Sequence, residues 1–270
     1  MLILLSHAAA FSALFVASVW DLKTTEVPDP VSLFGIIAGV GLHATYAYIH
    51  SAPEALYWSL GVGAVFSIYG WAMYYLGMWG GADALGMGVL GFAAPFGLSG
   101  INALYPVDLF LNLMIAGFIY TAGFAAYQAY RTEDVFASTY RRIIEQEKRV
   151  GLEILAAAVF ATVLQLTGAP GWLYFLALVF MVFFYRFLKV IEQDALVRTV
   201  KVDELEGGEV PVEGQGLGDR VKGLREEDIA EIEQEEIDVK SGVRFVPVFP
   251  VALVMTDVLG VGVTTLLALL

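Results

Sequence analysis

Long runs of apolar residues, separated by short polar segments, follow one another along most of the chain. Eight runs are at least 17 residues long, and a membrane-spanning helix needs about 20 predominantly apolar residues. The pattern therefore predicts an all-α polytopic membrane protein with about eight transmembrane helices. The fourth and sixth runs are the shortest and are also compatible with re-entrant segments, which would leave six crossings. The runs are 2–20, 31–50, 55–78, 82–98, 105–130, 151–167, 172–190 and 245–270.

Composition and the placement of basic residues support this class and orient it. Hydrophobic residues make up 58% of the 270 residues and charged residues 16%, which is more apolar sequence than one soluble core uses. With eight spans, all 15 Lys and Arg lie on the side that follows the first run, or at span ends facing it. The positive-inside rule makes that side cytoplasmic and both termini external. No basic segment precedes the first run, so we expect a retained span rather than a signal peptide.

Most of the net charge of −13 belongs to one segment. Residues 190–244 contain 16 Asp and Glu against seven Lys and Arg, so no basic surface suited to nucleic acid is expected. We therefore predict three parts: a transmembrane bundle over 1–190, an acidic cytoplasmic α+β insert over 191–244, and a final transmembrane helix over 245–270.

Two local patterns are expected inside the insert. The Val- and Thr-rich stretch 195–212, interrupted by a Gly-Gly pair, predicts a β-hairpin. Residues 226–237 predict a helix with a narrow isoleucine face that ends at Ile237. Its carboxylates are interpreted as a solvated face, and a further hypothesis is that they attract a basic substrate segment.

Asp21 and Asp83 each lie at the edge of an apolar run, on the same side of the predicted membrane. A carboxylate near hydrocarbon is costly, which favours a functional interpretation. Two carboxylates held close together cannot both ionise easily, so a pair would share a proton and activate water. For Asp21 the alternative is an ordinary headgroup-level carboxylate beside the basic Lys23.

Small residues adjoin the second aspartate. Gly80, Gly81 and Ala82 come directly before Asp83. Consecutive glycines weaken a helix at a membrane edge and let backbone approach closely. The sequence therefore predicts a place where another segment fits beside Asp83.

Other glycines fall inside the apolar runs. Gly86, Gly88 and Gly91 spell GxGxxG, and Gly35 and Gly39 spell GxxxG. A dinucleotide-binding GxGxxG follows a strand in a βαβ unit, whereas these positions lie within predicted spans. We interpret both motifs as sites of close helix packing.

Metal and thiol chemistry find little support in the sequence. The chain has no cysteine, which excludes disulfides, thiolate catalysis and Cys-ligated zinc. His7, His43 and His50 lack the spacing of a metal site. We expect no metal and no organic cofactor.

A third element stands at the start of the last run, where the sequence reads Val246-Pro247-Val248-Phe249-Pro250. Prolines there leave backbone groups free near the cytoplasmic face, as a docking site for an extended peptide requires. Ordinary helix entry is the alternative.

Together these elements resemble the prepilin and preflagellin peptidases, the GxGD-type intramembrane aspartyl proteases, and in particular their archaeal branch. Residues 21–29 are similar to the first catalytic segment of the family, and 80–83 to the second. Residues 245–250 are similar to its proline-containing segment before the last span. Ala82 departs from the strict GxGD pattern in a way that the archaeal version accepts.

The resemblance implies an aspartic endopeptidase of the cell membrane that needs no cofactor. It would remove the basic leader from preflagellin (archaellin) or type IV pilin-like precursors at the cytoplasmic face, with those precursors and the lipid bilayer as its partners. The implied catalytic residues are Asp21 and Asp83. The implied supporting or substrate-binding residues are Lys23, Gly80, Gly81, Ala82, Pro247 and Pro250.

A proton- or ion-coupled membrane transporter is the alternative from another class. Asp257 favours it, since this residue falls roughly 18 Å along the last run from Phe245 at the helical rise per residue, and intramembrane carboxylates relay protons. A transporter commonly shows internal repeats, and we find none.

Overall fold

The structure, a computed structural model, separates into two compact units. One unit comprises Met1–Thr121 with Gly242–Leu270, and the other comprises Ala122–Ser241. The predicted boundaries near residues 190 and 244 remain a prediction. The structure describes residues 1–24, 26–132, 134–166, 171–191, 193, 196–205, 210–212, 224, 229–230, 232, 234–240 and 243–258.

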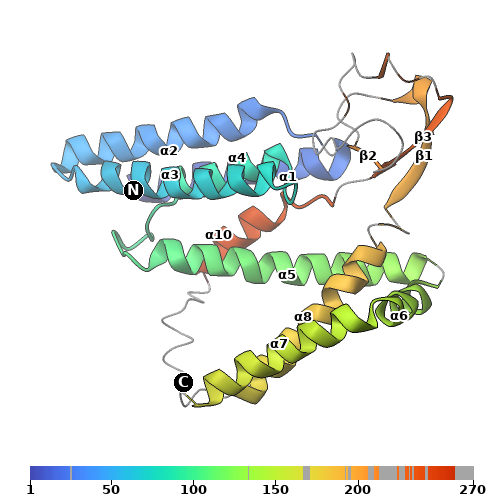
Figure 1. Ribbon diagram of the computed structural model, residues 1–270. Coiled ribbons are helices and arrows are strands. Elements are labelled where there is room, and N and C mark those ends of the chain that lie inside the picture. The colour runs from blue at the N-terminus through green and yellow to red at the C-terminus, as the bar shows by residue number, and fades with distance from the viewer. Residues whose placement is uncertain are drawn as a thin grey trace. The chain divides into compact units, whose positions relative to one another are not determined.

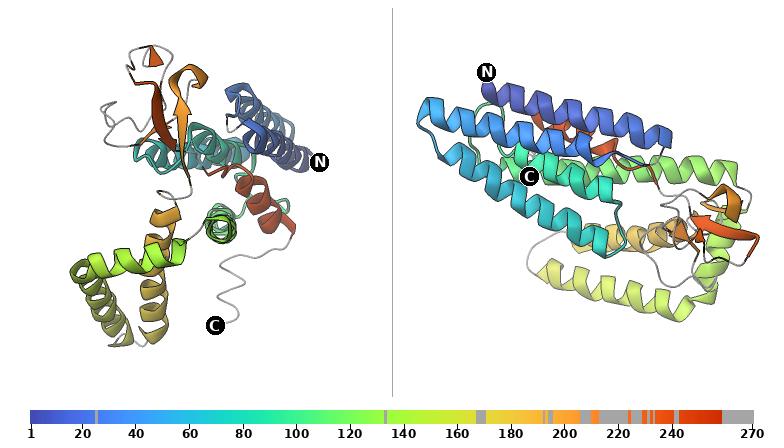
Figure 2. Two further views of the ribbon diagram at one scale, coloured as in Figure 1. Left: turned by 90° about the vertical axis from the view of Figure 1, so that its right-hand side faces the viewer. Right: turned by 90° about the horizontal axis from the view of Figure 1, so that it is seen from above.

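The first unit is a helical bundle built around a short helix, α4. This helix packs against three longer helices and against α10, and Figures 1 and 2 show α1 to α4 running side by side. α5 begins in this unit and adds Leu109 and Leu113 to the shared core. The helices of the unit are α1 (Leu2–Thr24), α2 (Asp29–His50), α3 (Glu54–Tyr75), α4 (Gly81–Ala93), α5 (Tyr105–Arg131) and α10 (Val248–Val258).

Glycines allow these helices to approach closely. A Cβ atom on Gly91 would lie 2.8 Å from the Gly63 Cα atom, and one on Gly35 would lie 2.9 Å from the Ala13 Cβ atom. A Cβ atom on Gly86 would lie 3.3 Å from the ring of Phe249. The interpretation of both glycine motifs as packing motifs is therefore confirmed.

The second unit contains the end of α5 and three further helices, α6 (Val135–Glu145), α7 (Glu147–Leu166) and α8 (Gly171–Val190). α7 and α8 pack on each other, and Arg186 of α8 bonds Glu153 of α7 at 2.7 Å. The sequence reading did not predict α6. It is amphipathic, with Val135 buried and Phe136 and Tyr140 exposed, and its apolar face is too short and too interrupted to read as a span.

The second unit also holds a small sheet, which corrects two local predictions. The strands are β1 (Val197–Lys201), β2 (Val210–Pro211) and β3 (Glu236–Lys240), with the 3-10 helix η2 (Val202–Glu204) after β1. Their order is β1-β3-β2, with both outer strands antiparallel to β3. The predicted hairpin of β1 with β2 is therefore wrong.

The prediction that the helix 226–237 extends to Ile237 is also wrong. Ile237 lies in β3, where Ile237 and Val239 are buried and alternate with polar residues, the period of two that a strand requires. Because β3 carries these buried side chains, β1 and β2 each pair with β3 rather than with each other. Five of the remaining residues of the predicted helix, 226–228, 231 and 233, fall outside the described residues.

Each of the eight apolar runs contains a helix, but within the described residues only four helices are long and apolar enough to cross a membrane. These are α1, α2, α3 and α5, while α4 and α10 are shorter apolar helices. Residues 259–270 of the last run lie outside the described part of the chain. The protein is thus a mostly helical, multi-pass membrane protein, and the count of eight stays a prediction.

Candidate active site

Asp21 is held near the C-terminal end of α1. Its side chain is buried, with 5% of the residue exposed. The Val246 backbone N–H donates a hydrogen bond of 3.1 Å to Asp21 Oδ2, and the positive charge of Arg244 also acts on this carboxylate. Two segments more than 200 residues apart in the chain therefore meet at this carboxylate.

Asp83 occupies the first turn of α4 and is 7% exposed. The backbone N–H of Gly80, the residue before the helix, donates a bond of 3.0 Å to Asp83 Oδ2. This contact is one half of a capping box, and it satisfies a backbone donor at the helix start. It also fixes the direction of the carboxylate.

The two carboxylates form an interacting pair. The charge of Asp21 acts on Asp83, so α1 and α4 hold the two carboxylates within electrostatic reach of each other. Asp83 Oδ1 is buried and has no hydrogen-bond partner among the described residues. A buried oxygen with unused acceptor capacity is uncommon.

The glycines beside Asp83 leave open space, and no other segment among the described residues packs closely against them. A Cβ atom on Gly80 would lie 3.5 Å from Asp83 Oδ2, and one on Gly81 would meet only the Tyr74 ring, at 4.0 Å. Ala82 is half-buried. Lys23, the remaining predicted residue of this end, is exposed in the last turn of α1.

The proline segment leads directly into the pair. Val246 is buried and uses its N–H on Asp21, while Val248 N–H and Phe249 N–H bond back to Phe245 O and Val246 O. Pro250 stands in the first turn of α10, where a missing N–H costs nothing. The N–H groups of Val246, Val248 and Phe249 are therefore not free for a docking peptide, and the two backbone bonds are those of the alternative, ordinary helix entry. The bond to Asp21 carried no sequence signal.

Aromatic side chains enclose this end of the site, and the sequence reading did not single them out. The Trp79 ring lies 6.0 Å from Phe245 and 6.1 Å from Phe249, between ring centroids. The Tyr120 hydroxyl donates to Arg244 O at 2.6 Å. These contacts fix the segment that supplies the Val246 N–H.

A third aspartate, Asp257, is partly buried in a separate cluster, with 11% of its side chain exposed. Tyr105 OH donates to Asp257 Oδ1 at 2.6 Å, and His7 Nδ1 lies 2.7 Å from Asp257 Oδ2. His7 Nε2 donates to Phe96 O at 2.9 Å, because a carbonyl can only accept. Both oxygens of Asp257 are thus used in holding α10 to α1 and to the start of α5.

A neighbouring set of polar groups also holds helices together. Ser6 Oγ lies 2.9 Å from His43 Nε2, and Ser6 donates to Ala93 O. Within the described residues no cluster of three or more His, Cys, Asp or Glu side chains is arranged to hold a metal ion. Two of the three histidines that seemed scattered in the sequence, His7 and His43, therefore have hydrogen-bonding partners inside the bundle, while His50 is exposed at the end of α2.

The fold and the site define a multi-pass membrane protein with two interacting buried carboxylates at one end of its bundle. Residues 8–124 match the family model described as the type IV leader peptidase family. This match confirms the resemblance to the prepilin and preflagellin peptidases and supports a protease of the leader peptidase kind. Both aspartates lie in the matched segment, and the proline segment lies outside it. No curated protein and no solved structure matches the chain.

Proposed function

We propose that the protein is an aspartic endopeptidase in which Asp21 and Asp83 form the catalytic pair. The observation that carries this proposal is the pair itself: two buried, interacting carboxylates on different helices, one with an oxygen that has no partner in the described residues. Burial of two like charges favours a state in which they share one proton. Such a pair can act as acid and base together.

The reaction follows from that shared proton. One carboxylate accepts a proton from water as the water oxygen attacks the carbonyl carbon of the scissile peptide, and the other carboxyl donates its proton to the carbonyl oxygen. The tetrahedral intermediate then collapses: the leaving nitrogen takes a proton from one carboxyl as the C–N bond breaks, and a hydroxyl of the intermediate returns a proton to the other carboxylate, which restores the pair. The titration belongs to the pair rather than to one residue.

The proposed substrates are preflagellin or type IV pilin-like precursors, cut between a basic leader and an apolar helix at the cytoplasmic face of the cell membrane. The family match supports a precursor protein as substrate. The proline segment lies beside Asp21, and Gly80 and Gly81 leave open space next to Asp83. Both features support an extended scissile peptide at this site. Lys23, at the end of α1, would lie at the headgroups.

The test is cleavage of precursors with a basic leader and an apolar helix by membranes that contain the wild type, Asp21→Asn or Asp83→Asn. We expect cleavage by the wild type and a loss of about 100-fold or more in the rate for either variant. Asp108→Asn is the matched control, because Asp108 is also a helix-borne aspartate but lies in the first turn of α5. Cleavage that stays near the wild-type rate in either pair variant, or is absent from the wild type across a panel of precursors, would overturn the proposal.

A further inference from the structure

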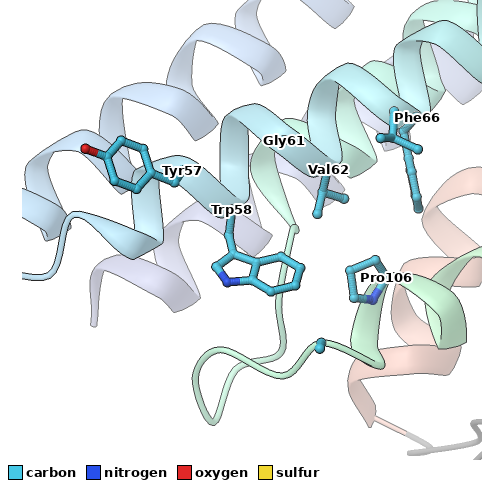
Figure 3. A pocket seen from close by; sticks show the side chains of 8 residues that line it. Tyr57, Trp58, Gly61, Val62, Phe66 and Pro106 are labelled. Atoms are coloured by element: carbon cyan, nitrogen blue, oxygen red, sulfur yellow. The ribbon is translucent and has the colours of Figure 1, made fainter.

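An apolar groove of about 460 Å³ lies between the first half of α3 and the start of α5. Figure 3 shows the Trp58 indole and Val62 projecting from α3 toward Pro106. The groove belongs to the first unit, apart from the carboxylates. Its main lining residues are Tyr57, Trp58, Gly61, Val65, Phe66 and Pro106.

Gly61 opens this groove. A Cβ atom at this position would meet no other atom within 4 Å, so no packing inside the protein requires a glycine there. Glycine inside a helix costs about 1 kcal/mol relative to alanine. In membranes, a glycine on a helix face lets the backbone of a second helix approach closely, which an acyl chain does not need.

A continuous row of aromatic rings joins the groove to the carboxylate pair. It starts at Phe66 in the groove wall and ends at Phe245, whose neighbour Val246 donates to Asp21. The successive distances between ring centroids are 6.3 Å for Phe66–Phe110, 5.1 Å for Phe110–Tyr69, 5.5 Å for Tyr69–Trp79 and 6.0 Å for Trp79–Phe245.

The groove also lies at a distance from the carboxylates, measured along α3, that a substrate helix can span. A Cβ atom on Gly70 of α3 would lie 2.9 Å from Ala84 O, so Gly70 is level with the residue after Asp83. Gly61 is nine residues back along α3, or roughly 13 Å at the helical rise per residue. A helix that leaves the carboxylates along this face would reach the groove roughly ten residues beyond the cleaved bond.

We propose that this groove is a docking site for the apolar helix of the precursor, which it contacts roughly ten residues after the cleaved bond. The inference rests on the proposed function and adds a binding subsite to it. The row of aromatic rings packs on the core of the bundle and connects the groove to the segment that contacts Asp21. The groove therefore contributes to substrate binding, and the carboxylates carry out the reaction.

The first experiment uses the absence of cysteine from the chain. Val65→Cys, in an Asp83→Asn background, is combined with a precursor that carries one cysteine eight to twelve residues after the cleavage site, and the two are joined with a short bis-maleimide. Ile37→Cys in α2 is the matched control, because Ile37 is 70% exposed and Val65 is 64% exposed. We expect a cross-linked product with Val65→Cys and little with Ile37→Cys.

The second experiment fills the groove. We expect Gly61→Leu to raise KM about tenfold with kcat unchanged, because it removes binding and leaves the chemistry intact. Gly41→Leu in α2 is the control, since a Cβ atom there also meets no atom within 4 Å, and its KM should not change.

The outcomes separate the two proposals. Equal cross-linking at Val65→Cys and Ile37→Cys, or an unchanged KM in Gly61→Leu, would overturn the groove as a docking site and would indicate lipid as its occupant. Cross-linking is measured without cleavage, so it stands even if the wild type cuts no precursor. That last result would overturn the proposed function alone.

Discussion

The two ends of the helical bundle bury aspartates in different ways. At one end, Asp21 and Asp83 each receive one backbone N–H bond, and Asp83 Oδ1 has no partner in the described residues. At the other end, both oxygens of Asp257 are bonded, one to Tyr105 and one to His7. His7 and Asp21 lie on the same helix, 14 residues or roughly 21 Å apart.

The comparison shows that burial of a carboxylate does not by itself mark a reactive site. Asp257 was the main support for a transporter, yet its bonds are those of a group that fastens helices together. Asp83, the candidate catalytic residue, has an oxygen without a hydrogen-bond partner among the described residues and open space beside the adjoining glycines. A carboxylate oxygen without a hydrogen-bond partner in the folded protein is available to a substrate or to water.

The largest expected effect is on cleavage in Asp83→Asn. The amide oxygen of asparagine can still accept the Gly80 N–H, but it cannot carry the shared proton. We expect the cleavage rate to fall by about 10²- to 10⁴-fold, with little change in the melting temperature. Cleavage and thermal unfolding in the same detergent measure both. A near-normal cleavage rate would contradict a catalytic role for Asp83 and would leave it no different from Asp257.

The next effect is on stability, in His7→Ala. This variant leaves Asp257 Oδ2 and Phe96 O without their partner. Leaving a buried hydrogen-bonding group without its partner costs about 1–3 kcal/mol, and two groups are affected here, so we expect a loss of at least that size in the free energy of unfolding. The rate of cleavage per folded molecule should change far less than in Asp83→Asn. A stable variant that cannot cleave would contradict a fastening role.

Glycines at the two ends should also differ. Gly91→Ala places a methyl group 2.8 Å from Gly63 Cα and from Phe66 Cβ, and we expect it to lower the free energy of unfolding by about 1–3 kcal/mol. Gly81→Ala meets only the edge of Tyr74, at 4.0 Å, and should change it by less than about 1 kcal/mol. Equal losses in chemical denaturation would show that both glycines serve packing.

The smallest effect is expected for Asp257→Asn. Asparagine can accept the Tyr105 hydroxyl and donate to His7 Nδ1, so both bonds have a neutral replacement. We expect a change of about 1 kcal/mol or less in the free energy of unfolding and retained cleavage of precursor. A folded Asp257→Asn variant without cleavage would place Asp257 in the chemistry.

Features that depend on local pattern were predictable from the sequence. Each apolar run contains a helix, and the close-packing role of Gly86 and Gly91 follows from their place inside a run. The motifs around Asp21 and Asp83 led to the family that residues 8–124 match. In each case a few adjacent residues carry the signal.

Features that depend on distant partners were not predictable. β1 and β2 look like a hairpin because they are neighbours in sequence, but the buried face of β3 decides the pairing. The bond from Val246 N–H to Asp21 comes from a backbone group, which has no residue signature. His7 and Asp257 are 250 positions apart, so neither residue alone indicated the pair.

The length of α4 has a consequence for hydration. Its 13 residues span about 20 Å, whereas the hydrocarbon layer of a bilayer is about 30 Å thick. A helix of this length that crosses the layer leaves non-helical backbone at membrane depth, where it is tolerated only inside protein or beside water. Residues 94–97, after the helix, are buried, and Gly80, before it, is exposed. The exposed end is the one that carries Asp83, and an end open to water is what the second reactant of a hydrolysis requires.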